Sequence, residues 1–201
     1  NSTATISNRS ATLNVAPGEI VHAVFESQYA TPVAASGTCG TVYSLGFGSG
    51  ASIVGPAQVG LTSYHYYNEA LTTPSDGYYT IRKTTSGWGN STLTDKTGDP
   101  NGYFLIVNSS YISDIYFRQK VTNLTIGELY TLSFSAADLS PSSNNIRPNI
   151  TLGIMDASTN TIIASKNTGN ITNVTNGSWQ EFSFDFIATS SSVDLFIKNN
   201  A

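Results

Sequence analysis

Apolar residues recur at every second position along several segments of the chain. Residues 130–136, 150–154 and 182–186 alternate apolar and polar side chains, and residues 193–197 continue this pattern near the C-terminus. A two-residue period is typical of β-strands with one face in a core and the other in solvent. No segment shows a convincing period of 3.6 residues, so we expect little or no helix.

Residues 103–107 are apolar on both strand faces, which predicts a central strand buried on both sides. Turn-forming residues separate the runs, for example at residues 99–102, 156–160 and 175–178, as antiparallel strands require. Short strands with frequent turns and no helical interludes favour an all-β fold. The sequence therefore predicts an antiparallel β-sandwich of the jelly-roll type.

The N-terminal third of the chain has a different texture. Residues 11–15 and 20–25 are apolar runs on either side of a Pro-Gly pair and predict a hairpin, whereas the stretch after them alternates weakly. We place a soft boundary near Pro74. Residues 1–74 then form either a small subdomain or edge strands of one large sandwich, and residues 75–201 form the jelly-roll sandwich.

The charge of the chain excludes one class of partner. The chain has nine basic and thirteen acidic residues, and only 11% of its residues are charged. A positive surface for nucleic acid is therefore not expected. Ser, Thr, Asn and Gly fill the gap, which is common in secreted and cell-surface β proteins. No apolar run is long enough to span a bilayer. The single Cys39 is either a free thiol or bridges to a cysteine outside this chain.

Short motifs follow one another from Asp76 to the end of the chain. They are Asp76-Gly77-Tyr78-Tyr79, Trp88, Asp95-Lys96-Thr97-Gly98, residues 102–108, Phe117-Arg118-Gln119-Lys120-Val121, residues 124–132, Arg147-Pro148-Asn149-Ile150 and Trp179-Gln180-Glu181-Phe182. In this order they resemble a jelly-roll domain of the secreted surface adhesins and gliding-motility proteins of Bacteroidetes. That domain is itself similar to MAM domains and to jelly-roll carbohydrate-binding modules.

The resemblance implies a module of a larger exported protein. Domains of this kind usually finish with an acidic strand just beyond the position where this sequence stops, at Asn199-Asn200-Ala201. We therefore expect the jelly roll to be truncated before its last strand.

Catalytic chemistry has little raw material in this sequence. His22 and His65 are its two histidines, and it contains no Gly-x-Ser-x-Gly elbow, His-Glu-x-x-His pair or phosphate-binding glycine loop. We expect that the protein is not an enzyme.

Asp95, Asp99 and Asn101 lie in one short loop. Oxygen ligands on an irregular segment suit Ca²⁺, which accepts carboxylates, amides and carbonyls in flexible geometry. The resemblance adds that the acid of such a loop can share a structural cation with an acid of the last strand. The alternative is an ordinary turn whose side chains bond to their own backbone.

Aromatic residues make up 11% of the chain and suggest a sugar site, because sugar C–H faces stack on rings while hydroxyls bond to polar groups. Tyr64, Tyr66 and Tyr67 form the densest cluster. Alternation also places Tyr116, Arg118 and Lys120 on one strand face, which is either a ligand surface or a solvated face. Trp88 and Trp179 are interpreted as core or core-edge residues.

The sequence thus predicts a non-catalytic, secreted or cell-surface module that binds glycans or an extracellular protein in adhesion. One alternative is a component of a surface assembly, or of secretion or motility machinery, in which the truncated edge accepts a strand of another chain. A structural spacer and a module attached to a glycoside hydrolase are the others.

Overall fold

The structure is a computed structural model that describes residues 4–7, 10–13, 41–70, 72–85, 93–140, 146–172 and 178–200. Cys39, Trp88 and residues 20–25 of the predicted hairpin lie outside the described residues. The chain divides into two compact units, Asn1–Gly40 and Thr41–Ala201. In the first unit, β1 (Ala4–Ser7) pairs antiparallel with β2 (Ser10–Leu13).

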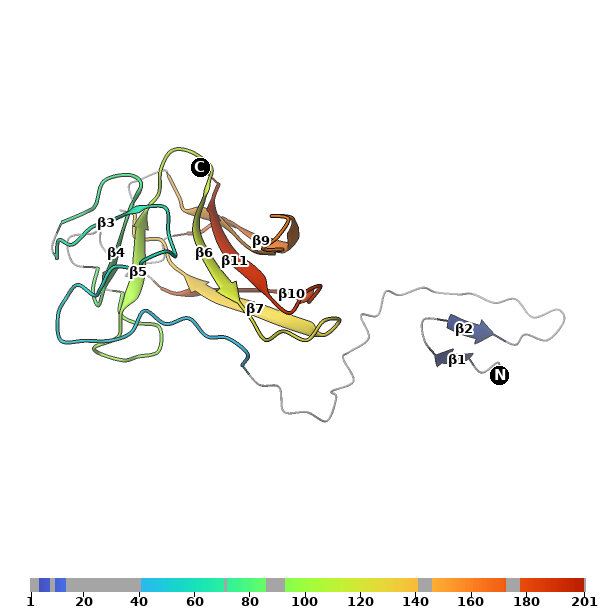
Figure 1. Cartoon of the computed structure of the whole chain (residues 1–201). Coiled ribbons are helices and arrows are strands. Elements are labelled where there is room, and N and C mark those ends of the chain that lie inside the picture. Colours follow the sequence, from blue (N-terminus) through green and yellow to red (C-terminus); the bar gives the residue numbers. More distant parts are fainter. Residues whose placement is uncertain are drawn as a thin grey trace. The chain divides into compact units, whose positions relative to one another are not determined.

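In the described part of the second unit, the remaining strands form three sheets (Figure 1). The strands are β3 (His65–Tyr66), β4 (Tyr78–Arg82), β5 (Phe104–Asn108), β6 (Ile115–Val121), β7 (Leu129–Ala136), β8 (Asn149–Met155), β9 (Ile162–Asn170), β10 (Gln180–Ile187) and β11 (Val193–Asn199). The sheet orders are β6–β11–β8–β9, β3–β4–β5 and β10–β7. Apart from the short β3–β4 pair, which is parallel, the described strand pairs are antiparallel. The described residues contain no helix, which confirms the predicted all-β sandwich. They accordingly include no helix that is long and apolar enough to cross a membrane.

The core lies where the alternating apolar residues of the sheets meet. Leu152, Ile154, Leu195 and Phe186 are buried in one cluster, as the two-residue period predicts. Leu132, Phe134, Phe184 and Ile197 are partly buried and pack against it. Ile150 and Phe182, which were predicted to join them, are half-buried near the starts of their strands. Phe182 instead stacks on Phe134, with ring centroids 5.2 Å apart.

Strand β5 is buried on both faces, but not as a central strand. Its one neighbour among the described strands is β4, so the predicted central position is wrong. Phe104 and Ile106 form a second cluster with Leu93, against which Trp179 and residues after β7 pack. The Trp179 indole donates to the Thr94 carbonyl at 2.9 Å. Irregular segments therefore bury the face of β5 that carries Phe104 and Ile106. Trp179 lies at the edge of this cluster, as predicted for a core-edge residue.

Residues before β4 add edge pairings to two sheets. Isolated bridges join Ser49 to Gly102 and Val54 to Arg82, on the side of the three-stranded sheet. A third bridge joins Thr62 to Phe117 on β6. The soft boundary near Pro74 stays a prediction.

A buried ion pair ties the chain after β7 to the chain before β8. The Asp138 side chain is fully buried, and its Oδ2 lies 3.0 Å from Nη1 of Arg147. Its other oxygen, Oδ1, accepts the backbone N–H of Ser140 at 2.8 Å. Because a buried carboxylate is costly without partners, this contact fixes how the two strands enter and leave the sandwich.

Candidate functional site

The outward face of the four-stranded sheet carries a row of polar groups. Leu195 on β11 points into the core, and side chains alternate along a strand, so Asp194 and Phe196 lie on the opposite face. The strand register places Phe196 opposite Arg118 on β6 and Gly153 on β8. We call this surface the outer face.

Arg118 is the best-fixed exposed cation of the outer face. Its Nε lies 3.1 Å from Oδ2 of Asp194, and its Nη2 donates to Oδ1 of Asn160 and contacts the sulfur of Met155. The Arg118 side chain is nevertheless 42% exposed, against 13% for Asp194. The guanidinium is therefore held in one position while part of it remains open to a ligand.

Lys120 lies next to this pair on the same face. Its cross-strand partner is Asp194, whose carboxylate is paired with Arg118 instead. Among the described residues Lys120 has no ion pair, so its ammonium group is available to other acceptors.

Phe196 and Gly153 form the apolar base of the outer face. The Phe196 ring is fully buried. A Cβ atom at position 153 would lie 2.3 Å from Cζ of this ring, which is closer than packed atoms approach. A glycine at 153 therefore lets the ring lie over β8.

At the other end of the outer face, side-chain amides bond to one another. Nδ2 of Asn200 donates to Oδ1 of Asn149 and to Oγ1 of Thr151, both at 2.9 Å. Nδ2 of Asn149 donates in turn to Oδ1 of Asn170 on β9, at 3.1 Å. Nδ2 of Asn167 also donates to Oγ1 of Thr151, at 3.5 Å. We call this group of side chains the amide network. Each carboxamide carries two donors and an acceptor, so the network offers both kinds of hydrogen-bonding group to a ligand.

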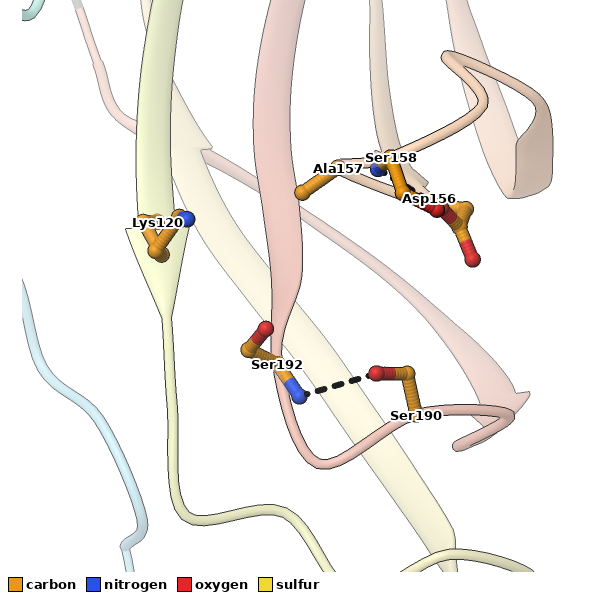
Figure 2. Close-up of a pocket in the computed structure, with 6 residues that line it drawn as sticks. All are labelled: Lys120, Asp156, Ala157, Ser158, Ser190 and Ser192. Atoms are coloured by element: carbon orange, nitrogen blue, oxygen red, sulfur yellow. Dashed lines mark hydrogen bonds between the residues drawn. The ribbon is translucent and has the colours of Figure 1, made fainter.

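A shallow hollow opens beside Lys120 (Figure 2). It has a volume of about 240 Å³ and is lined by Lys120, Asp156, Ala157, Ser158, Ser190 and Ser192. These residues come from β6 and from the loops that follow β8 and β10, which converge at one end of the sheet (Figure 2). The hollow thus combines an ammonium group, a carboxylate and hydroxyls.

The Asp156 carboxylate in this hollow is held in its charged form. Oδ1 accepts the Ser158 hydroxyl at 2.6 Å, the Ser158 backbone N–H at 2.7 Å and the Thr159 backbone N–H at 3.0 Å. These hydrogen bonds, the Ser158 hydroxyl first among them, lower the pKa of Asp156 to about 2. Asp156 is therefore an acceptor at every physiological pH.

The structure does not place the predicted tyrosines on an open surface together. Tyr64 and Tyr116 are buried and stacked, with ring centroids 5.0 Å apart, so their expected exposure is wrong. Burial raises the pKa of Tyr116, and the Tyr64 hydroxyl donates to Asp114 at 3.1 Å. Tyr66 is half-buried, packs against the core and bonds to the Gly55 carbonyl. Tyr67 is half-buried, and its ring meets the ring of Tyr78 on β4 edge-on.

The predicted calcium loop closes on itself. Oδ2 of Asp95 accepts the Thr97 backbone N–H at 2.8 Å, and Oδ1 of Asp99 accepts the Asn101 N–H at 2.8 Å. These are the turn bonds of the alternative interpretation. In the part of the chain that the structure describes, no three His, Cys, Asp or Glu side chains group as metal ligands. Calcium binding by Asp95, Asp99 and Asn101 stays a prediction.

Lys83 ties this loop to the segment before it. Its Nζ donates to the carbonyls of Gly50 at 2.9 Å and Ala51 at 3.0 Å, and to Oδ1 of Asn101 at 3.4 Å. We expect Lys83→Met to lower the free energy of unfolding by about 1–2 kcal/mol, because hydrogen bonds from a charged donor are lost. Urea denaturation measures this change. Lys120→Met is the control and should change stability by less than about 0.5 kcal/mol; equal losses would contradict the assignment.

Sequence reasoning missed the amide network and the hollow, whose members come from separate strands and loops.

The matching family model is described as a carbohydrate binding domain, and it covers residues 58–199. Neither the search of curated proteins nor the search of solved structures found a match. The matched segment contains the whole outer face except Asn200, together with the hollow, and it covers more than half of the chain. The chain therefore belongs to this family and contains a carbohydrate-binding module.

Proposed function

We propose that the module binds its glycan across the outer face of the four-stranded sheet, from the hollow to the amide network. The observation that carries this proposal is Arg118, a cation fixed by Asp194 and Asn160 and still partly exposed between the two polar ends. A ligand that spans the face would meet fixed groups along its length. Such pre-formed groups lose little conformational entropy on binding.

The groups of the outer face match sugar hydroxyls, which both donate and accept. Arg118 and Lys120 donate, Asp156 accepts, and the carboxamides of the amide network do both. The exposed plane of a guanidinium also packs against apolar ligand surface. Because binding replaces hydrogen bonds to water with similar ones, we expect modest affinity, in the micromolar to millimolar range for one module.

We also propose that the module acts without catalysis in a secreted or cell-surface protein, where it contributes to adhesion. The low charge content of 11% and the resemblance to surface adhesins support this setting. Modest affinity is sufficient there, since repeated modules on one chain add their binding through avidity. The roles in a surface assembly, as a spacer or beside a glycoside hydrolase stay alternative predictions.

Arg118→Ala should weaken glycan binding about tenfold or more. The variant loses a hydrogen bond from a charged donor to the sugar, and such a bond contributes about 1.5–3 kcal/mol. A glycan array selects the oligosaccharide, and isothermal titration calorimetry measures its dissociation constant for wild type and variant. Lys96→Ala is the control, because Lys96 is 45% exposed and pairs with Glu181 away from the outer face. Equal affinity of Arg118→Ala and wild type would contradict the proposed site.

A further inference from the structure

A second group of polar and aromatic side chains crosses the three-stranded sheet at one level. In the strand register, His65 on β3 stands opposite Tyr78 on β4, and Tyr78 stands opposite Asn108 on β5. Tyr79 and Val107, which follow and precede these positions, pack in the main core. Because side chains alternate along a strand, His65, Tyr78 and Asn108 face away from that core.

The rings of this row are in contact and partly open to solvent. The centroids of His65 and Tyr78 are 5.2 Å apart, and Tyr67 meets Tyr78 edge-on at 6.3 Å. His65 is exposed, while Tyr67 and Tyr78 are half-buried. Each ring therefore supports the next and still presents surface to a ligand.

Polar contacts fix the two ends of the row. Nδ2 of Asn108 donates to the Pro74 carbonyl at 2.9 Å, which orients the carboxamide. Oη of Tyr67 lies 2.6 Å from Oγ1 of Thr72, which orients the phenol. The backbone N–H of Tyr67 also donates to the Tyr79 carbonyl at 2.8 Å, so the main chain of Tyr67 is held to β4 while its phenol is held by Thr72.

We propose that His65, Tyr67, Tyr78 and Asn108 form a second carbohydrate-contact site, which takes the C–H face of one neutral pyranose. A sugar ring stacks on an aromatic surface, and its hydroxyls bond to the imidazole, the phenol and the carboxamide at the edges. The four side chains include no carboxylate and no ammonium group, so the chemistry favours an uncharged sugar.

This site is separate from Arg118, since it lies on a different sheet. Two sites on one module would let it hold one polysaccharide at two places or bridge two chains. Either arrangement raises the apparent affinity for a long polymer without any new contact. The inference does not depend on the proposed role of Arg118.

The test is a titration of the full chain with cellohexaose, xylohexaose and mannohexaose. Two-dimensional NMR monitors the backbone amide signals during each titration. The wild type should show two groups of shifting signals, one on β3–β5 and one on β6 and β11. Tyr78→Leu keeps apolar bulk but removes the aromatic face, and should weaken binding at β3–β5 about tenfold. His65→Ala should weaken the same group, and it changes a side chain that is already exposed.

The two sites can fail separately. If β3–β5 signals do not move, or move equally in wild type, Tyr78→Leu and His65→Ala, the second site is contradicted while the outer face stands. If only β3–β5 signals move, the second site is supported and the proposed role of Arg118 fails. No shift with any of the three hexasaccharides contradicts both. Tyr111→Ala is the control, because Tyr111 is an 80% exposed ring outside the row and should change neither group.

Discussion

Replacing Arg147 with methionine is expected to lower the free energy of unfolding by about 3–5 kcal/mol. The carboxylate of Asp138 is fully buried and receives Nη1 of Arg147 at 3.0 Å. Methionine keeps much of the apolar stem but removes the positive charge, so the carboxylate loses its ionic partner in a low-dielectric environment. The size of the effect comes from this stranded charge more than from the attraction itself.

Urea denaturation of wild type and Arg147→Met measures the loss, and Lys96→Met provides the matched control. Lys96 pairs with Glu181 at 2.8 Å, but the two side chains are 45% and 72% exposed. Breaking such a pair should cost less than about 1 kcal/mol. Similar losses in the two variants would show that burial of Asp138 does not govern the stability of the link between β7 and β8.

Phe196→Ala should cost about 3–5 kcal/mol, because it removes a fully buried ring from a packed site. This ring is not on the core side of β11 but over Gly153, on the outer face. The variant should therefore also make the positions of the neighbouring Arg118 and Asp194 side chains less fixed. Denaturant melts give the loss of stability, and circular dichroism shows whether the sheet remains formed.

A double-mutant cycle tests whether Gly153 is glycine because of this ring. A methyl group at 153 would lie 2.3 Å from Cζ and 2.4 Å from Cε1 of Phe196, so Gly153→Ala alone should cost about 1–3 kcal/mol through overpacking. In the Phe196→Ala background the clash with the ring is gone. The double variant should then be more stable than the sum of the single losses predicts; strictly additive losses would contradict the contact.

The strands of the sandwich were predictable because one face of each is buried. Alternation located residues 130–136, 150–154 and 182–186, and these fall within β7, β8 and β10. Strand partners were not predictable, since the same alternation fits many pairing orders. For β5 the pattern showed that both faces are buried. It could not show that Trp179 and Leu93 cover one of these faces while the strand itself lies at the edge of its sheet.

Alternation was right for Arg118 and Lys120 and wrong for Tyr116 at the predicted ligand face. Arg118 and Lys120 lie together on the outer side of β6 and are exposed. Tyr116 does not follow them, because the register with β11 shifts between Phe117 and Ile115, and its ring packs in the main core and stacks on Tyr64. A two-residue period gives the face of a side chain only where the strand is regular, and it does not show where a bulge shifts the register.

The amide network could not be found from local sequence. Asn149, Asn170 and Asn200 are far apart in the chain and meet because β8 pairs with β9 and with β11. The only sequence signal was the abundance of asparagine, which is equally typical of turns and solvated surfaces. The Asp156 hollow had a local signal, the turn at residues 156–160, but its partners Lys120 and Ser192 come from other segments.

The central claim is that carbohydrate binds across the outer face of the β6–β11–β8–β9 sheet. Its most direct test is a crystal structure of the chain with the oligosaccharide that gives the strongest response on a glycan array. We predict sugar residues within hydrogen-bonding distance of Arg118, extending toward Lys120 and Asp156 on one side or toward Asn149 and Asn200 on the other. An oligosaccharide bound only elsewhere, with the outer face covered by water alone, would contradict the account.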